Sequence, residues 1–395
     1  MQVVEINSPE LRKAFLELPV SLYKSDPNYI RPWDHDVENV FNPEKNKWFR
    51  EGEVTRWLLK DGAGKFIGRI AAFTHPKIER NTKTPTGGCG FFECINDQSA
   101  ANLLFNTAKA WLKTKGKESM DGPINFGEQD KWWGLLVQGF EPAQYGMNYN
   151  PPYYQELFEN YGFGNYYNQN VFRYDLSKHA PEKFHKAYQK LIKDPDISFD
   201  HARKNNLAKY AEDFRQVYNE AWGKAHAGFK PMRKEQTAAI MKTLKPIMIE
   251  DTLIFAYHKE RPIGIFLSIP NLNEIIKPLN GKFGLFQKLQ FLWRLKITKS
   301  FRTLSAIIFG IVPDFQGKGV DAGLAVMGQK WMIEPGKYDF IELMWIGDFN
   351  PKMNNIAEQL DTKKSKVLTT YRYHFDGRPV ERHPIINVKK KSEDA

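Results

Sequence analysis

The sequence predicts an α/β protein (α+β in its mixed sheet) built from two similar lobes in tandem. Its 395 residues exceed what one hydrophobic core usually supports. A β-hairpin pattern occurs twice, over 56–73 and 252–269, and the same order of strands and helices follows each hairpin. Repetition of one element order in two halves indicates an internal duplication.

Composition narrows the class of protein. Aromatic residues make up 14% of the chain, which suits a packed globular protein. The formal net charge of +11 favours phosphates, nucleic acid or anionic lipid as partners. Nucleic-acid binding is not expected, because neither a dense basic stripe nor a reader motif is visible. No apolar run approaches the roughly 18 residues of a spanning helix, and no secretory signal is visible, so we expect a cytoplasmic location.

The two cysteines, Cys89 and Cys94, are too few for a disulfide framework. No histidine or further cysteine accompanies them at the spacing of metal ligands. We therefore expect ordinary buried thiols and no metal site.

The first half begins with a helix capped by Ser8, with Leu11, Phe15 and Leu18 at helical spacing. The later elements follow from apolar runs and turn residues. Strands are expected at 56–60, 66–73, 91–95, 122–126 and 171–174, helices at 99–112 and 150–163, and a loop over 134–152. The aromatic Trp132 and Trp133 either line a substrate cavity or pack on the first lobe.

The second half repeats this order. Helices are expected at 185–192, 207–222, 234–244 and 322–332, and strands at 252–257, 262–269, 304–312, 340–346 and 369–374. Matching residues recur at equivalent places, among them Gly68 and Gly264, Trp111 and Trp331, Asn150-Pro151 and Asn350-Pro351, and Arg173-Tyr174 and Arg372-Tyr373. The predicted division is a first lobe over 1–178, a second lobe over 179–378 and a tail over 379–395.

One stretch of the second half predicts an anion site. The β-branched run 304–312 leads through Gln316-Gly-Lys-Gly-Val320 into a helix. Helix N-termini leave backbone N–H groups free, and glycines let a ligand approach closely. We interpret 316–320 as a pyrophosphate cradle. Two alternatives are a dinucleotide-binding fingerprint over 317–322 with Glu342 downstream, and a tight turn without a ligand. A P-loop is excluded because Gly319 follows Lys318.

A segment without a counterpart in the first half lies at 281–302. It holds six basic residues and no acidic residue, interleaved with apolar ones as in a basic amphipathic helix. One interpretation is an inserted helix with a solvated basic edge. The other is contact with a membrane surface or with a long acyl or acidic ligand.

The strand, Val-Pro-Asp-Phe-Gln-Gly-Lys-Gly-Val loop and helix resemble the acetyl-coenzyme A motif of the GNAT acyltransferase superfamily. Its pattern falls on Gln316, Gly319 and Asp321, where the aspartate departs from the expected small residue. A later GNAT motif matches at Asn354, but Asp361 stands where its tyrosine would be. The first half keeps only the closing part of that motif, at 157–163, and lacks the glycine loop.

This resemblance implies two tandem GNAT-like lobes. The implied cofactor is acetyl-CoA or another acyl-CoA, and the acceptor is an amine of a small molecule or peptide. The residues implied to bind the cofactor are Ile311, Val312, Gln316, Gly317, Lys318, Gly319, Val320, Ala322 and Asn354.

Acyl transfer to an amine also needs a base for the amine and an acid for the leaving thiolate. Glu342 and Asp348 are the candidate bases and Tyr371 is a substitute candidate for the acid. Alternatives remain open: an aminoacyl or long-chain acyl transferase similar to the Fem-type enzymes, and a non-catalytic protein that binds CoA or another partner.

Overall fold

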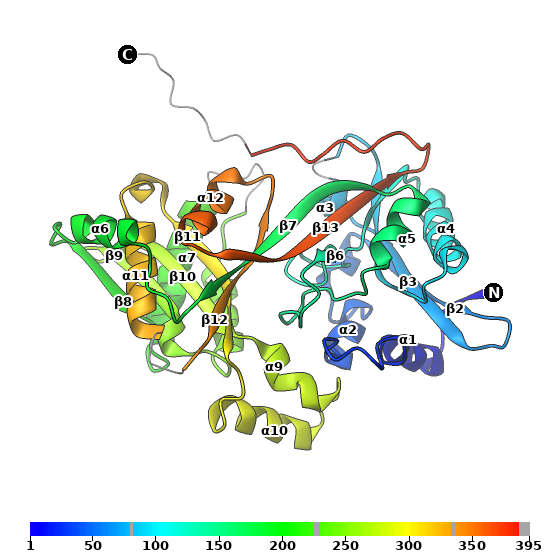
Figure 1. Cartoon of the computed structure of the whole chain (residues 1–395), viewed down its shortest axis with the longest axis horizontal. Helices are drawn as coiled ribbons and strands as arrows, with labels where there is room; N and C mark the ends of the chain where they lie inside the picture. The colour runs from blue at the N-terminus through cyan, green and yellow to red at the C-terminus, as the bar shows by residue number, and fades with distance from the viewer. Residues whose placement is uncertain (80–81, 224–229, 333–336, 387–395) are drawn as a thin grey trace, which may run out of the picture.

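The computed structural model describes residues 1–79, 82–223, 230–332 and 337–386. The two lobes lie side by side, and one mixed sheet of 13 strands runs through both (Figure 1). Its order is β1-β2-β3-β4-β5-β13-β7-β12-β11-β10-β9-β8, with β6 paired to β13. The fold class predicted from the sequence is confirmed.

In the first half, the strands are β1 (Gln2–Glu5), β2 (Glu53–Lys60), β3 (Phe66–Thr74), β4 (Thr86–Cys94), β5 (Ser119–Gly122), β6 (Leu135–Gln138) and β7 (Gly164–Asp175). Its helices are α1 (Pro9–Leu22), α2 (Asp34–Val40), η1 (Lys47–Arg50), α3 (Pro76–Glu79), α4 (Gln98–Thr114) and α5 (Tyr154–Tyr161).

In the second half, the strands are β8 (Ile197–His201), β9 (Leu253–His258), β10 (Arg261–Pro270), β11 (Thr303–Ile311), β12 (Phe340–Gly347) and β13 (Lys363–His374). Its helices are α6 (Glu182–Leu191), α7 (Leu207–Gly223), α8 (Lys234–Leu244), η2 (Glu250–Thr252), α9 (Leu272–Ile276), η3 (Lys277–Leu279), α10 (Leu285–Lys296), η4 (Pro313–Phe315), α11 (Val320–Met332) and α12 (Pro351–Gln359).

The expected elements are present, and further short helices and strands accompany them. Ser8 caps α1, as predicted, by accepting a hydrogen bond from the Leu11 N–H. The predicted loop over 134–152 contains the short strand β6, and the strand predicted at 122–126 ends at Gly122. β1, α2 and β8 were not expected. They are short, so their periodicity is too weak to separate them from loop.

The duplicated glycines have the same structural role in both lobes. Gly68 lies on β3 beneath α4, and a Cβ placed there would lie 2.8 Å from Leu104 Cδ1. Gly264 lies on β10 beneath α11, where a Cβ would lie 3.0 Å from Val320 Cγ1. Each glycine therefore lets the long helix of its lobe pack closely on the sheet.

The last strand of each half joins the other half's sheet. β7 pairs with β12, β13 pairs with β5, and β7 and β13 pair with each other. The two duplicated arginines secure this exchange. Arg173 on β7 is paired with Glu342 on β12, and Arg372 on β13 is paired with Asp121 on β5. The predicted boundary at residue 178 follows β7 in the chain, but the sheet crosses it.

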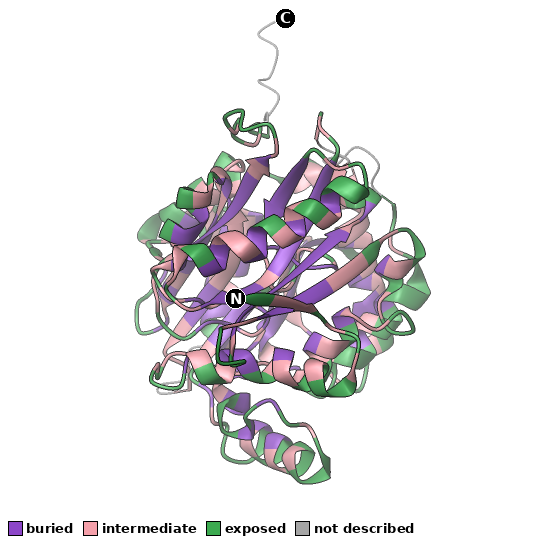
Figure 2. Cartoon of the chain, turned by 90° about the vertical axis from the view of Figure 1, so that its right-hand side faces the viewer, coloured by how far each residue is buried: buried purple, intermediate pink, exposed green. Residues whose placement is uncertain are grey.

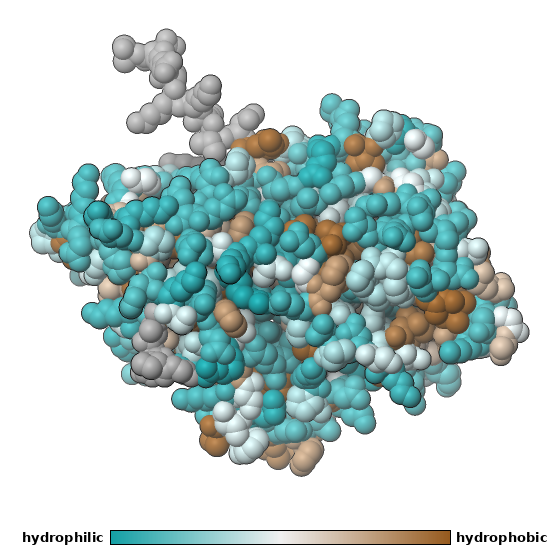
Figure 3. All heavy atoms as spheres, viewed as in Figure 1, coloured by the Kyte–Doolittle hydropathy of each residue, from teal (hydrophilic) through white to brown (hydrophobic). Residues whose placement is uncertain are grey.

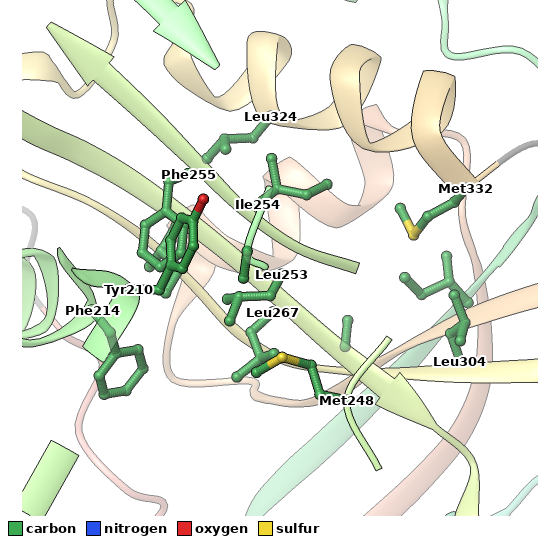
Figure 4. Packing of buried hydrophobic residues seen from close by; sticks show 14 of the residues in the cluster. Tyr210, Phe214, Met248, Leu253, Ile254, Phe255, Leu267, Leu304, Leu324 and Met332 are labelled. Atoms are coloured by element: carbon green, nitrogen blue, oxygen red, sulfur yellow. The ribbon is translucent and has the colours of Figure 1, made fainter. Parts of the chain in front are cut away.

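Buried apolar side chains fill both faces of the second lobe's sheet. Figure 4 shows Tyr210 and Phe214 of α7 on one side of the β9 residues Leu253 to Phe255, with Leu324 and Met332 of α11 on the other. The strands are buried along most of their length, while the outer helices alternate buried and exposed positions (Figure 2). This rigid layer carries the ends of β11 and β12, where the candidate site lies.

Candidate functional site

The parallel strands β11 and β12 pair over only part of their length. Pairing runs from Thr303 opposite Phe340 to Ala306 opposite Leu343. Beyond that point β12 stays paired with β7 on its other side, where Ile346 lies opposite Asn170, but no longer with β11. The side of β11 that faces β12 therefore loses its strand partner from Ile307 onward, and Ile307 becomes 38% exposed. Unpaired backbone of this kind can accept an extended ligand as if it were a strand.

The glycine loop follows at the end of β11. Gly317 and Gly319 have φ values of 74° and 92°, in the left-handed region that favours glycine. The first hydrogen bond of α11 is donated by Gly323 N–H to Gly319 O, at 2.9 Å. Within the described chain, the N–H groups of residues 319–322 have no hydrogen-bond acceptor. Four free donors at a helix N-terminus form an anion-binding geometry.

Strands, loop and helix surround one cleft of about 2090 Å³. The diverging strands line it with residues 306–311 and 343–347. The loop and α11 contribute Gln316, Gly317, Asp321, Ala325 and Gln329, and α12 contributes Lys352, Met353, Asn355 and Ile356. The cleft continues to the first lobe, where Trp133, Tyr166 and Tyr167 line it. An elongated ligand can thus extend from the glycine loop to the junction of the lobes.

Cations accompany the free amides at the loop. Lys352 Nζ donates a hydrogen bond to Gln316 Oε1 at 2.6 Å, and Gln316 Nε2 donates to Ile311 O at 3.0 Å. Lys318 lies over the Phe315 ring at 4.8 Å. Lys352 belongs to the Asn350-Pro-Lys motif, but it was not among the cofactor residues predicted from the sequence. Asp321 also lines the cleft and opposes this positive character.

The predicted cofactor residues do not all lie in the cleft. Ile311, Gln316 and Gly317 line the cleft, while Val312, Val320 and Ala322 are buried beneath the loop. The Asn354 side chain is engaged elsewhere: its Nδ2 donates to Gly347 O and Asn350 O, and its Oδ1 accepts from Asn170. Asn354 therefore holds α12 against β12 and β7. Lys318 and Gly319 belong to the loop that presents the free N–H groups.

Glu342, a predicted base, is fully buried in an ion-pair cluster. Its carboxylate contacts Arg173 at 2.7 Å and Lys366 at 3.1 Å and accepts from Gln144 at 2.6 Å. Burial alone would raise the pKa of Glu342, but Lys366 and Arg173 outweigh it and lower that pKa. A carboxylate held ionised by two cations is a weak proton acceptor. Glu342 therefore stabilises the junction of β12, β7 and β13.

The other two predicted catalytic residues lie apart from Glu342. Asp348 pairs with Arg382 at the surface. Tyr371 packs against Phe158 in the core of the first lobe and donates to Glu159 at 2.8 Å. The exchange of β13 carries Tyr371 there. None of the three lines the cleft, so the structure does not bring them together as an acid–base set.

The first lobe contains the same elements in a closed form. β4 and β5 pair in parallel from Thr86 to Gly88, and then Ile124 N–H donates to Cys89 O at 2.8 Å. A Cβ on Gly90 would lie 1.8 Å from Ile124 O, so the following chain fills this gap. The N-terminus of α4 is capped by the Asp97 carboxylate, which accepts from Ala100 N–H at 2.9 Å.

The two cysteines are buried thiols, as expected. Cys89 and Cys94 are free and buried, and burial raises the pKa of both thiols, that of Cys94 to about 12. Such thiols are chemically inert at neutral pH.

Comparisons with known proteins agree with this architecture. The chain is 27% identical over 387 residues to the bacterial ceramide synthase of Caulobacter vibrioides, covering 94% of this chain and 97% of that protein. It is 28% identical to protein YghO of Escherichia coli K12, covering 91% and 92%. A tandem GNAT protein from the clavulanic acid biosynthesis pathway superimposes with a TM-score of 0.53 at 10% identity, covering 96% and 99%. No protein-family model matches the chain.

The fold is therefore that of the GCN5-related N-acetyltransferases, in its tandem form, as the sequence motif had indicated. Within the described ranges, no helix is long and apolar enough to cross a bilayer.

Proposed function

We propose that the protein is an acyl-CoA-dependent N-acyltransferase whose second lobe binds the cofactor. One observation carries this proposal: the gap between β11 and β12 is continuous with a glycine loop that presents four unsatisfied N–H groups. The five residues from Ile307 to Ile311 extend roughly 17 Å at about 3.3 Å per residue. That is close to the length of an extended pantetheine arm, with its pyrophosphate at the loop.

The donor set fits a coenzyme A molecule. The N–H groups of 319–322, with Lys318 and Lys352 nearby, would hold the pyrophosphate, and the free edge of β11 would bind the amides of the pantetheine arm. When bound, the cofactor supplies an activated thioester to an amine. The chain aligns the thioester with the junction of the lobes, where Trp133, Tyr166 and Tyr167 enclose the acceptor side of the cleft.

We further propose a fatty acyl group and a lipid amine as substrates. A ceramide is the amide of a fatty acid and a long-chain amino alcohol, and the relative named a ceramide synthase aligns over 97% of its own length. The cleft of this chain also has an apolar inner section. It is lined by Phe266, Ala306, Met332, Ile341 and Leu343, all buried or half-buried. An acetyl group would leave that section empty.

Calorimetric titration tests the cofactor site, using CoA and octanoyl-CoA. Gly317→Glu places a carboxylate at the loop and should weaken binding about 100-fold, because like charges placed together cost several kcal/mol. Gly64→Glu is the matched control: both glycines have positive φ, and neither has an atom within 4 Å of a built Cβ. Equal binding by both variants would remove the proposed site.

Turnover tests the reaction and its rival. Release of CoA thiol should accompany acylation of a long-chain amino alcohol and should be weaker with acetyl-CoA and short amines. The rival, a CoA-binding protein without catalysis, is favoured by the positions of Glu342, Asp348 and Tyr371 outside the cleft. Tight binding with no thiol release across lipid, peptide and small amines would support that rival. Mass spectrometry of a copurified ligand would add the acyl length.

A further inference from the structure

A helical arm separates β10 from β11. It comprises α9, η3 and α10, and it projects below the body of the molecule in Figures 1 and 2. The first lobe has no counterpart to this insertion, because β3 leads to β4 through the four-residue α3 and a short connection. The arm is thus an addition to the duplicated fold, and its two sides differ in their surroundings.

The inner side of the arm is anchored to the first lobe. Trp33 packs against Phe283 and Phe291, with ring centroids 4.7 and 5.6 Å apart. Asp34 N–H donates to Gly281 O at 2.9 Å, and Phe291 and Leu295 are only 6% and 7% exposed. These contacts hold α10 in one orientation.

The outer side of α10 is also apolar, although no described part of the chain covers it. Leu285, Leu289, Leu292 and Trp293 fall on one helical face, opposite Phe291 and Leu295, and Lys296 lies on the same face one turn further. The large apolar side chains exposed here are Leu285 (77%), Phe286 (72%), Leu289 (60%), Leu292 (38%), Trp293 (53%) and Ile297 (70%). Hydrophobic residues are visible at the lower end of the molecule in Figure 3, where α10 lies in Figure 1. A patch of this kind marks an interaction surface.

Positive charge surrounds this outer face. Lys282, Lys288, Lys296 and Lys299 are exposed, and in the described chain no acidic side chain lies within ion-pair distance of them. Residues 281–302 contain no acidic residue. Arg294 is used differently, because it donates to the carbonyl oxygens of Glu274 and Ile275 at the end of α9.

We propose that the outer face of α10 is a docking surface for an anionic lipid bilayer, with the helix lying in the headgroup layer. Large aliphatic and aromatic side chains would enter the acyl boundary while the lysines contact lipid phosphates, as in interfacial amphipathic helices. Charge complementarity selects this partner over a second copy of the chain, because two such faces would bring their lysines together without acidic partners.

The position of the arm leaves the cleft open. α10 precedes β11, whereas the glycine loop follows it, so the two lie at opposite ends of the strand, roughly 27 Å apart at about 3.3 Å per residue. Lipid phosphates at the arm therefore do not compete with the proposed cofactor site. The lipid contact proposed for the arm uses none of the cleft residues, so vesicle binding and acyl transfer can be tested independently of each other.

Flotation of the full-length protein with vesicles tests the proposal. Vesicles of phosphatidylcholine mixed with phosphatidylglycerol, which supply a negative surface potential, are compared with vesicles of pure phosphatidylcholine. We expect binding to the anionic vesicles only and its loss with added salt. Leu289→Glu/Trp293→Glu should abolish it. Lys288→Glu/Lys296→Glu should weaken it at least 25-fold, about fivefold per lysine near the surface.

Matched controls separate the arm from general charge and general exposure. Ile192→Glu changes an apolar side chain that is 38% exposed at the C-cap of α6, and Lys190→Glu changes an exposed lysine of that helix; both variants should bind vesicles as the parent does. Circular dichroism and CoA titration of each variant confirm folding and an intact cleft. Absent vesicle binding by the parent, or equal binding by arm and control variants, overturns the proposal. A parent dimer that the Leu289→Glu/Trp293→Glu variant converts to monomer, without vesicle binding, would assign the face to self-association.

Discussion

The two lobes share one plan but differ at the place where their central parallel strands separate. In the second lobe the gap opens into a cleft of about 2090 Å³, whereas the cavity in the first lobe, around Tyr29, Arg69 and Glu93, measures about 80 Å³. In the first lobe the chain after Gly122 fills the gap, and Tyr154 Oη accepts from Cys94 N–H at the end of β4. In the second lobe the N–H groups of residues 319–322 have no acceptor in the described chain, and β11 is not paired with β12 beyond Ala306.

This difference explains how a duplicated fold can keep a ligand-binding cleft in only one of its two lobes. The Asp97 carboxylate caps α4 by accepting from Ala100 N–H, and its negative charge occupies the place that an anion would otherwise take. The matching helix α11 has two glycines with positive φ instead of such a cap. One lobe therefore provides stability and a wall for the cleft, and the other provides the binding groups.

The largest effect is expected at the two arginine–carboxylate pairs that secure the exchanged strands. Glu342→Gln should lower the free energy of unfolding by about 3–5 kcal/mol, because it leaves the buried Lys366 without its counter-ion and Arg173 with Glu141 alone. Asp121→Asn should cost less, since Asp121 pairs with one arginine, Arg372. Urea unfolding of both variants measures the difference. A larger loss at Asp121 would contradict the asymmetry.

The same Glu342 variant also sharpens the assignment of roles. If Glu342 is structural, Glu342→Gln should bind octanoyl-CoA within about threefold of the parent under conditions in which it is folded, since surface and structural changes away from a site leave binding nearly unchanged. A loss of turnover of more than about 100-fold in a stably folded variant would instead indicate that Glu342 acts as a catalytic base.

The second prediction concerns the paired glycines under the long helices. Gly68→Ala and Gly264→Ala should each destabilise by about 1–3 kcal/mol through overpacking. Gly68→Ala should cost more, because its Cβ would meet both Leu104 at 2.8 Å and the backbone oxygen of Glu93 at 3.1 Å. Thermal unfolding measures both, with Gly62→Ala as a control that has open space. Equal stability of all three variants would show that the helices can shift freely.

The third prediction compares the helix N-termini. Asp97→Ala should destabilise by about 1 kcal/mol through loss of the cap on α4. Asp321→Ala should change stability by no more than about 0.5 kcal/mol. It should raise affinity for octanoyl-CoA severalfold, because Asp321 lines the cleft beside the loop. Unfolding and titration distinguish the two, and unchanged affinity in Asp321→Ala would place the pyrophosphate elsewhere.

The smallest effects are expected in the pH dependence of stability, where the lobes should differ in sign. Lys366 and Arg173 lower the pKa of Glu342 despite burial. Its contribution is thus present above the ordinary value of 4.5 and lost as pH falls through the lowered pKa. Burial raises the pKa of Glu93, so its contribution is present below 4.5 and lost as pH rises through the raised value.

Denaturant unfolding across pH 3–7 measures these contributions. Glu342→Gln should flatten the acid side of the profile, and Glu93→Gln should remove a loss on the side above pH 4.5. Identical profiles in the two variants would mean that the buried carboxylates of the lobes titrate alike.

The elements and the cofactor loop could be predicted because their signals are local. The apolar run of β11, the glycines at 317 and 319 and the start of α11 lie within thirty residues of one another and follow from periodicity and turn chemistry. The catalytic candidates could not be placed in this way. Their positions depend on which distant strands pair, and short apolar strands offer many acceptable partners.

The sequence by itself therefore determined the glycine loop and the basic apolar arm, because each is a pattern within one segment, and the α/β class and the duplication, because the same local patterns recur in order in both halves. Tertiary structure alone decided the exchange of β7 and β13, which moved Tyr371 into the first lobe's core and enclosed Glu342 between two cations. It also decided that one gap is filled and the other open. These outcomes depend on contacts between residues as far as 251 positions apart, as in Arg372 and Asp121, and only the folded sheet brings them together.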